Sequence, residues 1–167
     1  MSIEAPTLRD IAMVKLALEE ARQALAHGKA GVGAVLVLGE EILARGHNMS
    51  VETGDQTAHA EMVVLQMAAR RLAQLTDAQK AQLAIYTSLE PCLMCFSALA
   101  HTGVKRIAYS ALIEDADEES MVVRGLTSDQ INDHLMSGPA VLIPGVCREA
   151  GQEIMALMGK GGDGLKG

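Results

Sequence analysis

Aromatic residues are almost missing from this 167-residue sequence, which contains no tryptophan, one phenylalanine and two tyrosines. A hydrophobic core must therefore be built from aliphatic side chains and from the 10 methionines, whose flexible thioethers fill irregular gaps. Long apolar runs are missing too, because the stretch from Ala34 to Leu38 is far shorter than the roughly 20 residues that span a bilayer. We expect a protein with no membrane segment and few side chains for stacking on a ligand ring.

Features of secreted proteins are absent as well. Three cysteines cannot all pair within one chain, and residues 1–15 lack the charged start and apolar run of a signal peptide. The composition therefore predicts a reduced, cytoplasmic location, with thiols that are free for other chemistry.

Basic residues are outnumbered by acidic ones. The sequence has 14 lysines and arginines against 21 aspartates and glutamates, which gives a formal net charge of -7 and a pI near 5.2. A surface of this sign repels phosphate backbones. Nucleic acid is therefore the less expected partner, and a free small molecule is the more expected one.

The length suits one domain, and no linker or internal repeat divides the chain. We place a single domain at residues 1–158 and a flexible glycine-rich tail at 159–167. Thr7 and Asp10 form a variant capping box that opens the first helix, and Thr57 or Asp55 is placed to cap the second. Caps and periodicity predict helices at 7–28, 58–73, 91–103, 128–135 and 148–158, and strands at 33–38, 42–46, 83–87, 106–109 and 140–143.

Helices that alternate with strands predict an α/β sandwich around a mixed sheet. The first two strands are expected to form an antiparallel hairpin, and the later strands are expected to run parallel. Ligands of such sheets commonly bind where strands lead into helices, so residues at these junctions are the candidates for a functional site.

A pair of cysteines opens one of the predicted helices. Cys92 and Cys95 lie three residues apart, just after Pro91, so their thiols share one face of a first helical turn and can both reach one metal ion. His59, at the start of another predicted helix, is the best candidate for a third ligand, and Glu61 follows as a proton carrier. Three protein ligands leave a tetrahedral zinc ion one open position for water, which is the arrangement of a catalytic site.

Each of these residues also has a simpler explanation. A lone C-x-x-C pair can be a redox dithiol or half of a zinc knuckle, but no second pair exists here to complete a four-cysteine site. A glutamate in the first turn of a helix usually complements the helix dipole, yet the neighbouring histidine and the downstream cysteines favour a catalytic role for Glu61. We therefore predict a zinc hydrolase.

His59-Ala60-Glu61 followed by Pro91-Cys92-Leu93-Met94-Cys95 matches the H-x-E…P-C-x-x-C signature of zinc nucleobase deaminases. From about Gly33 to Ala111 the chain resembles the cytidine and deoxycytidylate deaminase superfamily, nearest to its guanine deaminase and tRNA adenosine deaminase branches. The resemblance implies a three-layer α/β/α sandwich with a mixed five-stranded sheet, one zinc ion per chain, and a homodimer. It also implies that water attacks the amino-bearing ring carbon after losing a proton to Glu61, and that ammonia leaves.

The resemblance further implies residues that contact the substrate. Ala60 matches a small residue that lets the base approach the metal, and backbone groups of Ser88 and Glu90 match those that hold the base or its amino group. Asn48 aligns with an asparagine whose side-chain amide binds the base or sugar, although an ordinary turn residue is the alternative. His101 stands where guanine deaminases tend to carry tryptophan and tRNA adenosine deaminases often carry histidine.

The motif from Thr87 to Cys95 looks closest to guanine deaminases, and the acidic composition agrees with a free small molecule. We therefore expect a hydrolase acting on a C–N bond of a cyclic amidine, which releases ammonia from a free nucleobase or nucleoside, in particular a purine such as guanine. The acidic stretch from Glu114 to Glu119 either holds the amino edge of such a base or is simply solvated. Alternatives are a tRNA adenosine-to-inosine deaminase, a cytosine, cytidine or triazine deaminase, and a non-catalytic zinc-stabilised binding protein.

Overall fold

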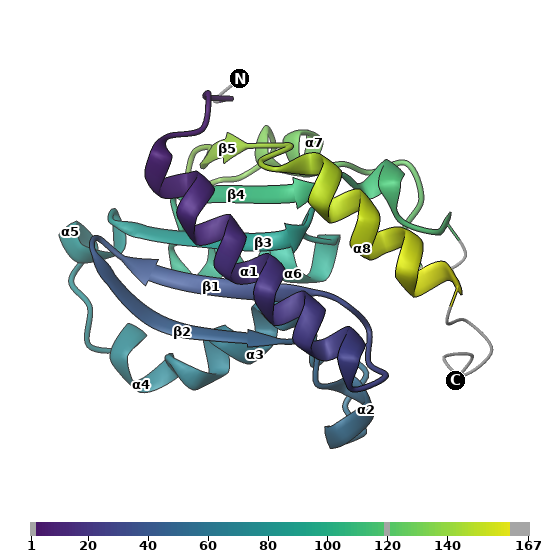
Figure 1. The fold of residues 1–167 in the computed structure, drawn as a ribbon. Helices are drawn as coiled ribbons and strands as arrows, with labels where there is room; N and C mark the ends of the chain where they lie inside the picture. The colour runs from purple at the N-terminus through teal and green to yellow at the C-terminus, as the bar shows by residue number, and fades with distance from the viewer. Residues whose placement is uncertain (1–2, 119–120, 161–167) are drawn as a thin grey trace.

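A mixed five-stranded sheet forms the middle of the molecule in the computed structural model, which describes residues 3–118 and 121–160 (Figure 1). Its strands in chain order are β1 (Gly33–Leu38), β2 (Glu41–His47), β3 (Leu83–Leu89), β4 (Arg106–Ala111) and β5 (Val141–Ile143). Their order across the sheet is β2-β1-β3-β4-β5. β1 is antiparallel to β2 and to β3, whereas β4 is parallel to β3 and to β5. The predicted hairpin and the later parallel strands are confirmed.

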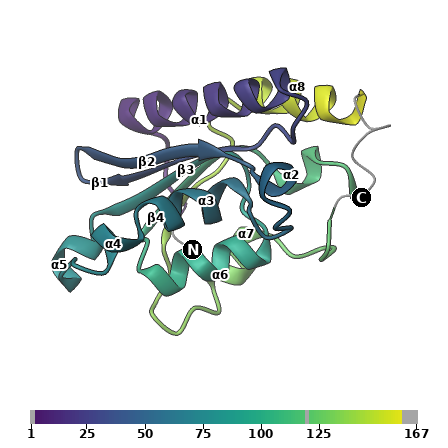
Figure 2. The same cartoon turned by 90° about the horizontal axis from the view of Figure 1, so that it is seen from below.

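Helices cover both faces of this sheet (Figure 2). One face carries α1 (Leu8–Ala26) and α8 (Arg148–Lys160), and the other carries α3 (Ala60–Met67), α4 (Ala69–Leu72), α6 (Leu93–Thr102) and α7 (Ser128–Asn132). The short helices α2 (Ser50–Thr53), α5 (Asp77–Lys80) and η1 (Ile113–Asp115) lie in connections between these elements. The expected three-layer α/β/α sandwich is therefore confirmed.

Two hydrophobic cores form because successive side chains of a strand point to opposite faces of the sheet. Beneath α3 and α6 lie the buried side chains of Leu36, Ile85, Phe96, Leu99, Ile107 and Leu142. Beneath α1 and α8 lie those of Val14, Leu18, Val35, Val37, Tyr86, Ile143 and Ile154. Both cores are largely aliphatic, as the composition predicts, but the methionines contribute less than expected, because Met155 is the only buried one in the described part of the chain.

The helix predicted at 58–73 is divided into two segments. α3 begins at Ala60, Ala68 leaves helical geometry with φ −91° and ψ 0°, and α4 follows directly. The periodicity places Ala69 in the core, but Ala69 is exposed and Ala68 takes its place. The buried side chains of this region are those of Ala60, Glu61, Val64, Leu65, Ala68 and Leu72.

The ends of the chain show one confirmed cap and one shifted boundary. Thr7 Oγ1 accepts a hydrogen bond of 3.1 Å from Asp10 N, and Asp10 accepts one of 2.8 Å from Thr7 N, so the predicted capping box is present. α8 runs to Lys160, two residues past the domain boundary predicted at 158, and residues 161–167 of the predicted tail lie outside the described residues. Within the described part of the chain, no helix has both the length and the apolar character needed to cross a bilayer.

Candidate metal centre

Three side chains from distant parts of the chain meet at the start of α3 and α6. His59 Nδ1 lies 3.7 Å from Cys92 Sγ and 3.6 Å from Cys95 Sγ, and one ligand atom from each residue lies within 4.8 Å of the others. Cys95 is fully buried, whereas His59 and Cys92 are partly exposed. The site is therefore closed on its protein side and open at one edge.

The metal-binding side chains sit at the N-termini of two helices on the same face of the sheet. His59 is the N-cap residue of α3 and Cys92 is the N-cap residue of α6; each accepts the first backbone hydrogen bond of its helix, from Val63 N at 2.9 Å and Phe96 N at 2.8 Å. The sequence predicts that this helix begins at Pro91, but α6 begins two residues later, at Leu93. Free N–H groups and the positive end of each helix dipole favour a thiolate at this position.

The cap predicted for α3 is wrong. Asp55 does not reach the helix, because its carboxylate accepts hydrogen bonds of 2.8 Å and 2.7 Å from the backbone and hydroxyl of Thr57 in the preceding turn. His59 occupies the cap position without a capping side-chain hydrogen bond, which leaves its imidazole free for the metal.

The geometry fits zinc. Bond lengths of about 2.0–2.1 Å to nitrogen and about 2.3 Å to sulfur in a tetrahedral site place the ligand nitrogen about 3.6 Å from each sulfur. The observed distances from His59 Nδ1 to Cys92 Sγ and Cys95 Sγ are 3.7 Å and 3.6 Å. Two thiolates and one imidazole are also the ligand types that zinc prefers, so the chain provides three protein ligands and leaves a fourth position for water or substrate.

Without a cation, the three ligands hold their protons unequally. The hydrogen bond with Cys95 and the nearby His59 outweigh burial and lower the pKa of Cys92 to about 4. The same contact with Cys92, together with burial, raises the pKa of Cys95, and the interaction with Cys92 also raises the pKa of His59. A zinc ion takes the place of these protons, since it binds thiolates and a neutral imidazole.

Glu61 lies in the first turn of α3, two residues after His59. Its side chain is only 3% exposed, and burial followed by the nearby Cys92 raises the pKa of its carboxyl group. A buried carboxyl with a raised pKa beside a metal site is suited to accept a proton and return it at neutral pH. The carboxylate of Glu61 therefore lies close to His59, Cys92 and Cys95, as the sequence predicts.

Of the predicted substrate residues, Ala60 adjoins this cluster along the chain, whereas Asn48 comes at the start of the loop that leads to it. Ala60 is the first residue of α3 and is fully buried, directly between His59 and Glu61. Asn48 follows β2, and the next residue, Met49, donates a backbone hydrogen bond of 2.9 Å to Ala58 O. This bond closes the loop so that its two ends, Asn48 and His59, come together.

Ser88 lies near the end of β3 and Glu90 lies in the segment between β3 and α6, and the side chains of both form hydrogen bonds within the protein. Ser88 Oγ accepts a hydrogen bond of 2.9 Å from Gly33 N. The Glu90 carboxylate accepts bonds of 2.7 Å from Ser128 N and 2.9 Å from Ile113 N. Both oxygens of the Glu90 carboxylate are thus occupied, and the contact of backbone groups of Ser88 and Glu90 with a substrate remains a prediction.

His101 is exposed in the last turn of α6, and its proposed contact with the substrate remains a prediction. In the acidic stretch, Asp115 is bound to Arg148 through two hydrogen bonds of 3.0 Å and Glu114 pairs with the same arginine. Asp115 therefore joins η1 to α8.

The bridging role of the Glu90 carboxylate has no signal in the sequence, because its partners lie 23 and 38 residues away.

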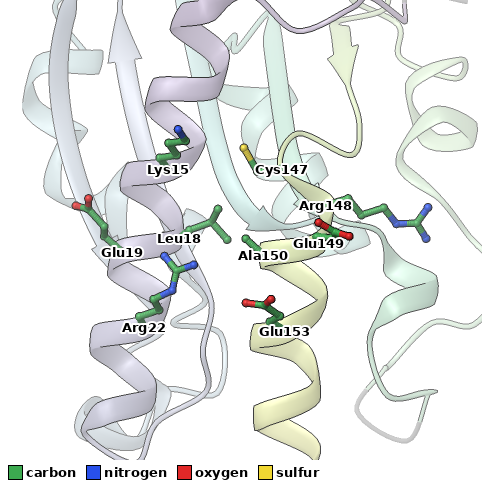
Figure 3. Close-up of a pocket in the computed structure, with 9 residues that line it drawn as sticks. All are labelled: Lys15, Leu18, Glu19, Arg22, Cys147, Arg148, Glu149, Ala150 and Glu153. Carbon is green, nitrogen blue, oxygen red and sulfur yellow. The ribbon is translucent and has the colours of Figure 1, made fainter.

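Two hollows lie outside the ligand cluster. An apolar one of about 610 Å³ adjoins the start of α6 and is lined by Leu93, Gly125, Leu126, Gln130, Ile131, His134 and Leu135. A groove of about 590 Å³ runs between α1 and α8, where Arg22 of one helix faces Glu153 of the other (Figure 3). Because α1 and α8 cover the opposite face of the sheet from α3 and α6, this groove is not part of the metal centre (Figure 2).

Known proteins resemble this chain in sequence and in fold. Residues 8–111 match the family model of the cytidine and deoxycytidylate deaminase zinc-binding region. The tRNA-specific adenosine deaminase of Aquifex aeolicus is 39% identical over 99 residues, which are 59% of this chain and 64% of that enzyme. The alignment thus spans slightly less than two thirds of that relative's length.

Solved structures agree with the sequence comparison. A structure from a study of tRNA A34 deaminases is 31% identical with a TM-score of 0.69, over 86% of this chain and 98% of that one. The guanine deaminase of Bacillus subtilis is 33% identical with a TM-score of 0.58, over 65% of this chain and 68% of that one. With the family model matching more than half of the chain and its zinc ligands gathered at one point, the protein belongs to the cytidine and deoxycytidylate deaminase family of zinc-binding proteins.

Proposed function

We propose that the protein is a zinc-dependent hydrolytic deaminase whose substrate is an adenosine in tRNA. The observation that carries the reaction type is the buried Glu61 beside a three-ligand site formed by His59, Cys92 and Cys95. Three ligands and an adjacent proton carrier suit hydrolysis, because a purely structural site has no use for the carboxylate.

The residues divide the chemistry between them. Zinc in such a site supplies Lewis acidity that makes water nucleophilic near neutral pH. The Glu61 carboxylate accepts a proton from the attacking water and passes it to the ring nitrogen. It then accepts the proton of the newly formed hydroxyl group and passes it to the departing amine. A C–O bond forms, the C–N bond breaks, and the products are the carbonyl base and ammonia. Glu90 N is already bonded to Ala111 O at 2.8 Å, which leaves the carbonyl of Glu90 to accept from the substrate amino group.

The choice of tRNA rests on the relatives. The Aquifex aeolicus enzyme and a second tRNA-specific adenosine deaminase, from Agrobacterium fabrum, are 39% and 41% identical to this chain. These similarities support the tRNA alternative more strongly than the free purine that composition alone favours.

Charge supports a second candidate, a deaminase of a free purine base such as guanine. The net charge is -7, and the arginines that could hold phosphates are mostly engaged with carboxylates. Ion pairs with aspartate or glutamate involve Arg9, Arg45, Arg71, Arg106, Arg124 and Arg148. The similarity to the Bacillus subtilis guanine deaminase agrees with this candidate.

Ammonia release from a panel of substrates separates the two candidates. The zinc-loaded protein is incubated with an anticodon stem-loop carrying adenosine at the wobble position, with the bases guanine, adenine and cytosine, with their nucleosides, and with an s-triazine. Glu61→Gln provides the blank, since it removes the proton carrier and leaves the three ligands in place.

Turnover of the stem-loop alone supports the main proposal, and turnover of guanine alone replaces it with the second candidate. Ammonia from no member of the panel, with one zinc bound per chain, contradicts both and favours a non-catalytic zinc-stabilised binding protein.

We also expect a homodimer in a cytoplasmic setting and a single domain over residues 1–158. Light scattering after gel filtration measures whether the protein is a dimer.

A further inference from the structure

Two backbone hydrogen bonds fix the start of the loop between β2 and α3. Asn48 N donates to Val32 O at 3.0 Å, and Met49 N donates to Ala58 O at 2.9 Å. Ala58 directly precedes the ligand His59. The backbone of Asn48 and Met49 is therefore held beside the segment that leads into His59, before any substrate is present.

The orientation of the Asn48 amide is fixed by Ser50. Asn48 Oδ1 accepts a hydrogen bond of 3.0 Å from Ser50 N and one of 2.7 Å from Ser50 Oγ. A backbone N–H can only donate, so the amide atom that faces it must be the oxygen. The amide nitrogen Nδ2 then faces away from Ser50, and it has no hydrogen-bond partner within residues 3–118 and 121–160.

We propose that Ser50 is a positioning residue that orients the Asn48 amide with its NH₂ group toward the substrate. The site then selects substrates that present a hydrogen-bond acceptor to this group. The proposal rests on the deaminase function proposed above. Asn48 Nδ2 donates to a ring nitrogen, carbonyl or hydroxyl oxygen of the substrate. A substrate that presents only an N–H at this edge is disfavoured, because two donors then face each other and one loses its partner.

The short helix α2 is held from outside, which keeps Ser50 in place. Glu52 of α2 forms an ion pair with Lys29 in the α1–β1 connection, and the two side chains are only 26% and 21% exposed. Thr53, in the same helix, donates from Oγ1 to Met49 O at 2.8 Å. Thr53 thus supports the same loop without touching the Asn48 side chain, which makes it a matched control.

Four variants test the proposal in the zinc-loaded protein: Asn48→Asp, Ser50→Ala, Ser50→Thr and Thr53→Ala. Asn48→Asp keeps an oxygen for both bonds from Ser50 but replaces the free donor by an acceptor, so it separates loop geometry from recognition. Ser50→Ala removes the hydroxyl, and Ser50→Thr restores it. Steady-state kinetics are measured with whichever member of the panel the wild-type protein deaminates.

We expect Asn48→Asp to raise KM about tenfold and Ser50→Ala to raise it about threefold, with kcat within about twofold of wild type in both. Ser50→Thr and Thr53→Ala should retain the wild-type KM. A double variant that combines Asn48→Asp with Ser50→Ala should have the same KM as Asn48→Asp alone, because Ser50 acts only through the Asn48 side chain. Additive effects, or an equal loss in Thr53→Ala, overturn the proposal.

A second readout does not depend on turnover. The side-chain NH₂ signals of Asn48 in a ¹⁵N-labelled sample should shift and broaden in Ser50→Ala and stay unchanged in Thr53→Ala. If they stay unchanged in Ser50→Ala, the positioning role is wrong whatever the substrate is. If they change while the wild-type protein deaminates nothing, the proposed function fails and the orientation of Asn48 stands.

Discussion

Glu90 accepts a hydrogen bond of 2.7 Å from the backbone nitrogen of Ser128, the first residue of α7. Its second carboxylate oxygen accepts one of 2.9 Å from Ile113 N, at the start of η1. Since Pro91 and Cys92 follow directly, one buried carboxylate joins the metal-binding segment to both ends of the connection between β4 and α7.

Glu90→Gln should therefore destabilise the protein. A glutamine offers one oxygen for two backbone donors, and its own NH₂ group then faces the second, which leaves a buried donor without a partner. We expect a loss of about 2 kcal/mol in the free energy of unfolding, or roughly 6 °C in Tm. Glu149→Gln, at an exposed position of α8, is the control. Equal thermal transitions for the two variants would show that Glu90 does not hold these segments together.

Removing a zinc ligand should remove the metal. Cys95→Ser replaces a buried thiolate by a hydroxyl, which is a far weaker ligand for zinc, so zinc content should fall from one ion per chain to almost none. Cys147→Ser changes the third cysteine, which lies before α8 on the other side of the sheet, and should retain the ion. Atomic emission spectrometry of the two purified variants measures the difference. A full complement of zinc in Cys95→Ser contradicts the assigned ligand set.

Replacing Glu61 should separate metal binding from catalysis. Glu61→Gln keeps the size of the side chain but cannot accept a proton, so turnover should fall by about 10²–10⁴-fold while zinc content stays at the wild-type level. Ammonia release and metal content are measured on the same sample. Wild-type turnover in this variant refutes the proton-carrier role.

The metal ligands were within reach of sequence-based prediction because their identity and short spacing carry the information. Cys92 and Cys95 are one helical turn apart, and only the remote His59 required a guess about which helices come together. The cap of α3 was not predictable. Asp55 is a residue type that often caps helices, but here its carboxylate accepts a hydrogen bond from Thr57 N in the preceding turn instead. Competition between a local turn and a helix start is decided by packing, which a single sequence does not show.

Contacts between distant residues account for the rest. The bond from Ser50 N to Asn48 Oδ1 spans two residues and has a recognisable Asx-turn pattern, so it could have been proposed from the sequence. The contact between Glu90 and Ser128 spans 38 residues and has no such pattern. The break at Ala68 also has no local signal, because alanine is the best helix former and the run around it favours an unbroken helix.

Gly33 is a position where no side chain fits, although its place in β1 gives no hint of it. A Cβ atom there would lie 2.1 Å from Ala17 O and 2.7 Å from Ala21 N, both backbone atoms of α1. Gly33→Ala should cost about 3 kcal/mol of stability or prevent folding, because α1 must move away from the sheet. Gly46→Ala in the neighbouring strand β2 is the control, since its Cβ would meet Val63 at an ordinary 3.4 Å. Urea denaturation of both variants measures the contrast, and similar midpoints would contradict it.

Asp10 should make the protein sensitive to acid through its contact with Arg106. The carboxylate is 1% exposed and accepts hydrogen bonds of 3.0 Å and 2.7 Å from the Arg106 guanidinium, which links α1 to β4. Burial alone would raise the pKa of Asp10, but the bonds from Arg106 and Thr7 outweigh it and lower the pKa from 3.8 to about 2.

A lowered pKa stabilises the folded state while the carboxyl is ionised. The contribution, about 2 kcal/mol, is fully present above pH 4 and is lost as the pH falls from about 4 to about 2. Asp10→Asn should therefore be less stable than wild type at pH 6, and the difference should shrink as the pH falls through this window. Asp133→Asn, at an exposed position, is the control. A difference between Asp10→Asn and wild type that stays constant from pH 6 to pH 2.5 contradicts the assigned role of Asp10.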